Sequence, residues 1–396
     1  MDTMIEKGKD LIEQGEYSKA QGYFSALLEQ SERNLPAHLW LARLHFMEGK
    51  PDSALQHIKA AEAINPRDNE TKALKGLYYV QADKYPEALG LLESVAGAEP
   101  GLAFNFTNLS TAYRELDRIP EAIEAGRKGV QLNPKDPAAH FALSQALAVD
   151  GRIEDAIHDA LEALKLNPSH LMAYVFLGTL YRQAGQTDTV IELYKECLRH
   201  VPEADPIREE LVELLVAGKD DAAALEHVTI LAEQRGLPKD YFYLGQCAEK
   251  LNQDELAERA FRRATELDPG NWRPYLLLGD LYAKRGMGED AVSAYSAALK
   301  RDPGNAELMN TLGLTLVRTG RPADGEPYLR KAMRRMPDRF EPVLNMAIGY
   351  AAQQHWKEAK EHANSVLKGT ESGSELHEEA KRLLTAIGEE QRSRSN

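Results

Sequence analysis

The sequence contains very little cysteine. Only Cys197 and Cys247 occur among 396 residues. Two thiols cannot build a disulfide framework, and this pair lacks the close CxxC spacing of a metal site. We therefore expect both to be small buried residues of a protein that works in a reducing compartment.

Long hydrophobic runs are also missing. No window approaches the roughly 18 apolar residues that a membrane-spanning helix needs. The N-terminal stretch MDTMIEKGKDLIEQGEYSKAQ mixes acidic and basic residues and has no continuous apolar core, so a secretory signal is not expected. These absences predict a cytoplasmic protein without membrane insertion.

Basic charge is not in excess. The chain has 48 Lys and Arg against 62 Asp and Glu, a net charge of −14. Nucleic acids and anionic membranes are bound through basic surfaces, so neither is an expected partner. The acidic excess is mild for this length and favours a simple contribution to solubility.

Catalytic signatures are absent as well. The sequence has no GxxxxGK[ST] phosphate loop, no GxGxxG after a strand, no HExxH and no GxSxG. His38 and His45 are seven residues apart and could share a helical face, but no second ligand pair lies near them in the sequence. We expect no catalytic residue, no cofactor and no metal.

The sequence does contain a repeated unit. In its clearest copy, from Tyr275 to Pro303, apolar and small residues recur every three or four places in two segments. That spacing puts them on one face of each of two helices. The turn Arg285–Gly286 separates the segments. The pattern predicts a helical hairpin that recurs along the chain.

The repeat has a period of 34 residues. Six units fill residues 1–204, a 33-residue unit spans 205–237, and four more units of 34 fill 238–373. The eighth and twentieth places are small in ten of eleven units, the exceptions being Val212 and Val190. Two helices that cross closely need a small residue at the contact. Asn–Pro or Asp–Pro closes several units, because proline ends a helix.

This pattern resembles the tetratricopeptide repeat, over about 373 of the 396 residues. The resemblance implies an all-α fold, a right-handed α-solenoid in which antiparallel helical hairpins form a superhelix. It further implies a concave groove lined by the first helix of each repeat. The function that it implies is binding of other proteins.

Three segments differ from the regular repeat. Residues 205–237 are one residue short, carry Val212 at the tight crossing and concentrate acidic residues, so we expect an irregular repeat and a possible flexure. Residues 374–390 read as a single capping helix for the open end of the solenoid. Residues 391–396 are expected to be a disordered tail.

The candidate binding face follows from helical geometry. If the fourth, seventh, eighth and eleventh places pack, the fifth, ninth and twelfth share another face, which by the resemblance lines the groove. The candidates on and beside this face are Leu39, Arg43, Phe46, Met47, Leu77, Val80, Phe104, Asn108, Thr111, Arg114, Phe141 and Gln145. Apolar residues that packing does not require indicate a docked partner segment. The alternative is that neighbouring repeats bury them.

A basic cluster is a second candidate site. It consists of Arg330, Lys331, Arg334 and Arg335 on the second helix of the tenth unit. It could dock an acidic segment or a phosphate. The alternative is a solvated outer face balanced by nearby acids.

The sequence therefore predicts a non-enzymatic scaffold or adaptor that binds a peptide or helix of another protein in its groove. Because Arg43 and Arg114 stand near the apolar face, an acidic residue in the partner would be complementary. The alternative is a regulatory or assembly subunit of a multiprotein enzyme, a secretion or pilus machine, or an envelope-assembly complex.

Overall fold

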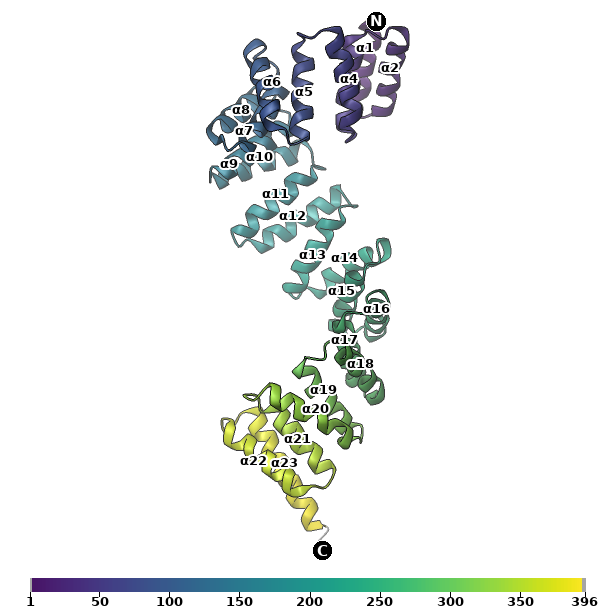
Figure 1. The fold of residues 1–396 in the computed structure, drawn as a ribbon, viewed down its shortest axis with the longest axis vertical. Helices are drawn as coiled ribbons and strands as arrows, with labels where there is room; N and C mark the ends of the chain where they lie inside the picture. The colour runs from purple at the N-terminus through teal and green to yellow at the C-terminus, as the bar shows by residue number, and fades with distance from the viewer. Residues whose placement is uncertain (1, 394–396) are drawn as a thin grey trace. The chain divides into compact units, whose positions relative to one another are not determined.

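The computed structural model describes residues 2–393, and these contain 23 α-helices and no strand (Figure 1). The first helices of the hairpins are α1 (Asp2–Glu13), α3 (Leu35–Met47), α5 (Asn69–Gln81), α7 (Ala103–Glu115), α9 (Pro137–Val149), α11 (Leu171–Gln183), α13 (Asp205–Ala217), α15 (Pro238–Lys250), α17 (Trp272–Lys284), α19 (Ala306–Arg318) and α21 (Glu341–Ala352). The second helices are α2 (Tyr17–Gln30), α4 (Pro51–Ile64), α6 (Tyr85–Ala98), α8 (Ile119–Leu132), α10 (Ile153–Leu166), α12 (Thr187–His200), α14 (Asp221–Gln234), α16 (Asp254–Leu267), α18 (Gly288–Arg301), α20 (Pro322–Arg335) and α22 (Trp356–Gly369). The last helix is α23 (Glu375–Ser393).

The helices begin and end at the same places of each unit. First helices end at the thirteenth place, and second helices run from the seventeenth to the thirtieth. The 33-residue unit keeps both helices at these lengths. Its missing residue falls in the link after α14, where three residues precede Pro238, instead of the four that separate Leu267 from Trp272.

The turn inside each hairpin has one recurring backbone conformation. At the fifteenth place φ is positive in all eleven hairpins, between 55° and 81°. Glycine takes this conformation without a steric penalty. Five hairpins nevertheless carry another residue there: Asp83, Asp117, Lys219, Asn252 and Gln354.

The small residues at the eighth and twentieth places lie at the helix crossing. Ser110, at an eighth place, donates its hydroxyl to the carbonyl of Ala122, at a twentieth place, over 2.8 Å. The crossing has a second contact. A Cβ on Gly76 would lie 2.5 Å from Leu92 Cδ2, so the eighth place also faces the twenty-fourth.

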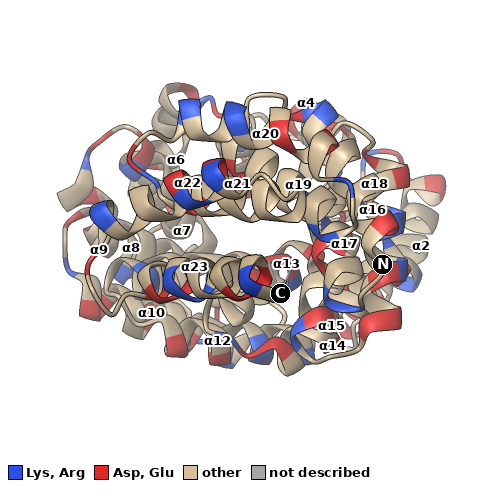
Figure 2. Cartoon of the chain, turned by 90° about the horizontal axis from the view of Figure 1, so that it is seen from below, with Lys and Arg blue, Asp and Glu red and all other residues tan. Residues whose placement is uncertain are grey.

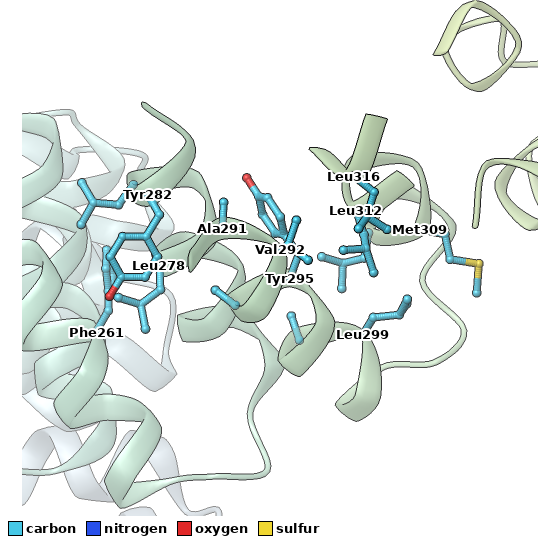
Figure 3. Close-up of a cluster of buried hydrophobic side chains, with 14 of the residues drawn as sticks. Phe261, Leu278, Tyr282, Ala291, Val292, Tyr295, Leu299, Met309, Leu312 and Leu316 are labelled. Atoms are coloured by element: carbon cyan, nitrogen blue, oxygen red, sulfur yellow. The ribbon is translucent and has the colours of Figure 1, made fainter. Parts of the chain in front are cut away.

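The core continues from hairpin to hairpin. Figure 3 shows one part of it, where Phe261 of α16, Tyr295 of α18 and Leu312 of α19 belong to a single cluster. Both Phe261 and Leu312 are almost fully buried. In this part of the chain each hairpin therefore completes its core with the next one, as nearest-neighbour packing of a solenoid requires.

The chain divides into two compact units, residues 1–207 and 208–396. Each is an all-α solenoid of antiparallel hairpins, which confirms the predicted fold class. In the second unit Val212 is 1% exposed and packs in one cluster with Val228, so its side chain is accommodated.

The C-terminal helix α23 packs against α22 and α21. Ala380 and Ile387 are its buried residues. The helix extends to Ser393, three residues into the segment that was expected to be a disordered tail. Residues 394–396 lie outside the described residues.

Candidate functional site

Three first helices of the first unit surround a pocket of about 470 Å³. Ile5 and Lys9 of α1, Trp40 and Arg43 of α3, and Glu70 of α5 line it. The predicted residue Arg43 thus lines a pocket. Ile5 and Lys9 of α1, which were not among the candidates, line it too.

Arg43 is held firmly in this pocket. Its guanidinium lies 4.7 Å from the ring centre of Trp40 and 5.5 Å from that of Phe104. It also pairs with Glu70 over 2.6 Å. Burial lowers the pKa of Arg43, against the opposing effect of Glu70, and burial also raises the pKa of Glu70. Arg43 therefore already has an acidic partner.

Part of the predicted binding face is core. Leu39 is 5% exposed and belongs to one buried cluster with Ile58 and Leu74. The expectation that packing does not need Leu39 is wrong, because the next hairpin covers the fifth place here. Asn108 is also buried, at 9% exposure.

The other apolar candidates of α3, α5 and α7 are half-buried. Phe46, Leu77 and Phe104 pack against the cluster of Leu39, and Val80 packs against the next one. Met47, by contrast, is 59% exposed. For this part of the face, the alternative of burial between repeats describes the structure better.

Farther along, α9 carries one exposed apolar side chain near its C-terminal end and α11 carries two near its N-terminal end, and we call these three residues the exposed apolar surface. Val149 is 58% exposed, Met172 60% and Val175 36%. They occupy the thirteenth, second and fifth places, which share one helical face with the ninth. The sequence analysis missed all three because it followed only the fifth, ninth and twelfth places of the earlier repeats.

A second pocket of about 340 Å³ adjoins this surface. Arg114 of α7, Gln145 and Val149 of α9, and Phe176 and Thr179 of α11 are among its lining residues. Arg114 donates to Gln145 and pairs with Glu115. The structure thus brings the predicted residues Arg114 and Gln145 together across two repeats.

Two further candidates have contacts of their own. Phe141 is half-buried, with its ring centre 5.7 Å from that of Phe176 in an edge-on arrangement. Thr111 is half-buried and donates within its helix to the Thr107 carbonyl over 3.4 Å. Phe141 therefore supports the apolar surface, while Thr111 leaves only part of its side chain for a partner.

Two of the four predicted basic residues join neighbouring repeats. Arg330 pairs with Glu326 over 2.7 Å and donates to the Tyr350 hydroxyl over 2.6 Å. Arg335 donates to the Gly304 carbonyl over 2.9 Å. The helices in Figure 2 carry acidic and basic residues interspersed. In the described residues, Lys331 and Arg334 have no hydrogen bond or ion pair to another repeat.

Polar pairs replace apolar packing inside three hairpins. They join the fourth and twenty-third places: His38 Nδ1 to His57 Nδ1 at 3.0 Å, His140 Nδ1 to Asp159 Oδ1 at 2.8 Å, and Arg208 Nη1 to His227 Nδ1 at 3.4 Å. The sequence analysis treated the fourth place as packing and missed them. A polar residue at both places of one hairpin is the signal that could have found them.

A third imidazole, that of His45, lies beside the His38–His57 pair. His45 stacks on His57 with ring centres 5.4 Å apart. His38 Nε2 lies 2.9 Å from the Glu32 carbonyl, which can only accept, so with both rings neutral His57 donates its Nδ1 proton to His38 Nδ1. Among the described residues no group of three or more His, Cys, Asp or Glu has the geometry to hold a metal ion.

Both cysteines are buried thiols, as expected. Burial raises the pKa of Cys197 to about 11 and that of Cys247 to about 11. Because the thiolate is the reactive form, neither is suited to nucleophilic or redox chemistry at neutral pH.

Comparison with known families agrees with this geometry. Residues 169–383, more than half of the chain, match the tetratricopeptide-type family described as "Cilia and flagella-associated protein 70 C-terminal domain". Residues 11–78, 74–137 and 107–170 match tetratricopeptide repeat models. The chain belongs to this tetratricopeptide-repeat family. Such repeats are generally non-catalytic, and their fold supports protein–protein interaction.

Curated relatives match parts of this tetratricopeptide-repeat chain. One is the protein O-mannosyl-transferase TMTC1 of Homo sapiens, 25% identical over 218 residues, which are 54% of this chain and 24% of the relative. Another is the phagocyte signaling-impaired protein of Drosophila pseudoobscura pseudoobscura, 28% identical over 132 residues, which are 33% of this chain and 13% of the relative. The chain thus spans no more than about a quarter of either relative's length.

A solved structure is similar in fold. The C-terminal part of a tetratricopeptide repeat-containing protein from Cytophaga hutchinsonii is 16% identical, with a TM-score of 0.49. The match covers 61% of this chain and 99% of that one. Among the described residues, no helix of this tetratricopeptide-repeat chain is long and apolar enough to cross a membrane.

Proposed function

We propose that this chain is a non-enzymatic scaffold that holds a peptide or helix of a partner protein against the first helices of residues 1–204. The observation that carries the proposal is the exposed apolar surface of Val149, Met172 and Val175. Large apolar side chains that neither packing nor a neighbouring repeat covers are typical of a docking surface.

The pocket beside this surface adds polar groups at its edge. Gln145 and Gln183 carry amides and Thr179 a hydroxyl, and all three line the pocket of about 340 Å³. Thr179 donates within its helix to the Val175 carbonyl, which leaves its oxygen able to accept. Apolar anchors with a few polar groups around them match the general anatomy of a protein interface.

The charged pocket around Arg43 can orient the bound partner segment. Because Glu70 already pairs with Arg43, an acidic partner residue has to compete with Glu70 for the guanidinium. We therefore propose that the apolar anchors on α9 and α11 supply most of the affinity, and that charges at Arg43 set direction and on-rate. The buried thiols fit a reducing compartment, which we propose to be the cytoplasm.

A second candidate function is that of a regulatory or assembly subunit within a larger complex. Lys331 and Arg334 on the second helix α20 favour it, because both are exposed and neither has an ion pair within residues 2–393. In that case the convex side of the second unit would carry the contact.

Site-specific photo-crosslinking tests the first proposal. Benzoylphenylalanine is placed at Val149 or at Met172 in the full-length chain, and at Leu161 as a matched control. Leu161 is 42% exposed but lies on the second helix α10. The proposal expects a discrete crosslinked partner from Val149 and Met172 and none from Leu161. Benzoylphenylalanine is also placed at Lys331 on α20, and a crosslink from Lys331 alone would favour the second candidate instead.

A further inference from the structure

The first unit holds a pocket of about 840 Å³ on the side of its second helices. The pocket lies between α6 and α8 and is floored by α7. Phe106, Leu109 and Tyr113 form the floor, with Ala96 and Ala125 at the two sides. This trough is separate from the pockets of the first helices that carry the proposed function.

The ninth repeat differs from the fourth at the place that corresponds to the floor of the trough. There Arg301, at the thirtieth place, stacks on Tyr275, at the fourth place, with 3.8 Å from its guanidinium to the ring centre. It also donates to the Tyr275 hydroxyl over 2.7 Å. In the fourth repeat the corresponding residues are Leu132 and Phe106. No guanidinium can cover Phe106 from that place.

The trough has one acidic and one basic end. Glu93, Glu121 and Glu124 line the end near Tyr113, and Arg127 and Lys128 line the other. Arg118 neutralises part of the acidic end by pairing with Glu121 over 3.0 Å and with Glu93 over 3.6 Å. Glu124, Arg127 and Lys128 have no ion pair within residues 2–393, so their charges remain for a ligand.

We propose that this trough binds an amphipathic helix of a partner protein. Phe106 and Tyr113 are seven residues apart on α7, which is about 10 Å and two helical turns. The matching ligand presents large apolar side chains at i, i+4 and i+7. This site goes beyond the proposed function, because it would make the chain bind on two faces.

The charges also fix the direction of the ligand helix. Acidic residues are favourable in the first turn of a helix and basic residues in the last turn. An acidic first turn fits Arg127 and Lys128, near the C-terminal end of α8, and a basic last turn fits Glu121 and Glu124. The bound helix therefore runs antiparallel to α6 and α8.

Two designed peptides of 16 residues test the proposal by fluorescence anisotropy. Both carry leucines at i, i+4 and i+7. The first has glutamates in its first turn and lysines in its last, and the second has these charges exchanged. The full-length chain is expected to bind the first peptide at least tenfold more tightly. Since the peptides also differ in intrinsic helicity, variants of the protein decide the question.

The decisive variant exchanges the charges of the trough. The double change Glu124→Lys and Lys128→Glu is expected to remove the preference for the first peptide, because with Arg118 counted it leaves neither end of the trough with a net charge. Ala96→Phe fills the trough and is expected to weaken binding of the first peptide at least tenfold, whereas Leu161→Phe on α10 leaves it unchanged. Circular dichroism shows whether each variant is folded, and the charge exchange keeps the test valid if Ala96→Phe unfolds.

Three outcomes would overturn the proposal. The first is that neither peptide binds the unaltered chain. The second is that binding occurs but the charge exchange leaves the preference unchanged. The third is that Met172→Asp, on the first helices, weakens peptide binding while Ala96→Phe does not.

Discussion

Gly279 lies directly against the ring of Tyr295, so that a Cβ on the glycine would be 2.5 Å from the ring carbon Cδ1. The two residues are sixteen positions apart, at the eighth and twenty-fourth places of one hairpin. All six glycines at eighth places face a large residue in this way: Gly8 and Phe24, Gly76 and Leu92, Gly178 and Tyr194, Gly245 and Phe261, Gly279 and Tyr295, Gly313 and Leu329. Where the eighth place is larger, as at Val212, the twenty-fourth is smaller, here Val228. The side chains at the eighth and twenty-fourth places therefore fill the same space at the helix crossing, so that a larger residue at one requires a smaller residue at the other.

We expect Gly279→Ala to destabilise the second unit by about 1–3 kcal/mol, because the added methyl overpacks the crossing. Chemical denaturation followed by circular dichroism measures the change. Gly388→Ala is the matched control, since a Cβ there meets nothing within 4 Å. That change should stabilise α23 by roughly 0.5–1 kcal/mol through helix propensity. A rescue of Gly279→Ala by Tyr295→Leu would establish the shared volume, and equal effects at Gly279 and Gly388 would rule it out.

The sequence predicted the hairpins well because their signals are local. Helix positions are set by small residues at the eighth and twentieth places and by prolines after the second helices. Both act through steric contacts within a single repeat. The pairing of Gly279 with Tyr295 was missed, although both columns were visible, because sequence reasoning paired the small residues with each other.

The candidate site was predicted less well because it depends on contacts between neighbouring repeats. Whether the fifth place is open or covered depends on how the following hairpin packs, which closes over Leu39 but leaves Val175 exposed. The trough over Phe106 depends on how α6 and α8 flank α7, because all three helices line it. The residue pattern within one repeat predicts neither the burial of Leu39 nor the opening of the trough.

The non-glycine residues in the hairpin turns store backbone strain. Lys219 has φ of 63°, a left-handed conformation that costs about 1–2 kcal/mol for residues with a Cβ. We expect Lys219→Gly to raise stability by about 1 kcal/mol, measured by thermal unfolding. The reciprocal change Gly320→Lys, at the same place with φ of 80°, should lower it by a similar amount. No change in either variant would contradict this account of the turn.

The histidine group of α3 and α4 predicts acid sensitivity of the first unit. Burial, with the nearby charges of His38 and His45 adding to it, lowers the pKa of His57 from 6.5 to about 4. Between these values the unfolded chain binds a proton that the folded chain resists, so stability falls as pH decreases from 6.5 toward 4 and then levels off. His57→Gln should reduce this fall in the melting temperature. Identical pH profiles for the variant and the unaltered chain would refute the prediction.

The short link after α14 is held by Asp240. This carboxylate is 1% exposed and accepts hydrogen bonds from Arg235 Nη2 over 2.7 Å and from the Leu237 amide over 3.0 Å. The hydrogen bond to Asp240 raises the pKa of Arg235, with Glu209 acting in the same direction. We propose that this pair limits the opening of residues 205–237, the segment expected to act as a flexure.

Asp240→Asn should therefore cost about 1–3 kcal/mol, because it removes a buried charged acceptor while Arg235 keeps its ion pair with Glu209 at 2.6 Å. Hydrogen exchange should accelerate in residues 205–237 and stay unchanged in 306–318. Asp254→Asn, which removes an exposed pair with Lys284 at 3.3 Å, should cost no more than about 1 kcal/mol. If both variants exchange alike, Asp240 does not hold the link.

The most direct test of the central claim is the affinity of the crosslinked partner for two matched variants, measured by calorimetry. Met172→Asp places a charge on the proposed docking surface, and Leu161→Asp places one on the second helix α10. We predict that Met172→Asp weakens binding by about 1–3 kcal/mol, as loss of a central apolar anchor does, while Leu161→Asp leaves the affinity unchanged. Unchanged affinity in Met172→Asp, together with loss of binding in Arg334→Glu, would show that the basic second helix α20 is the site instead.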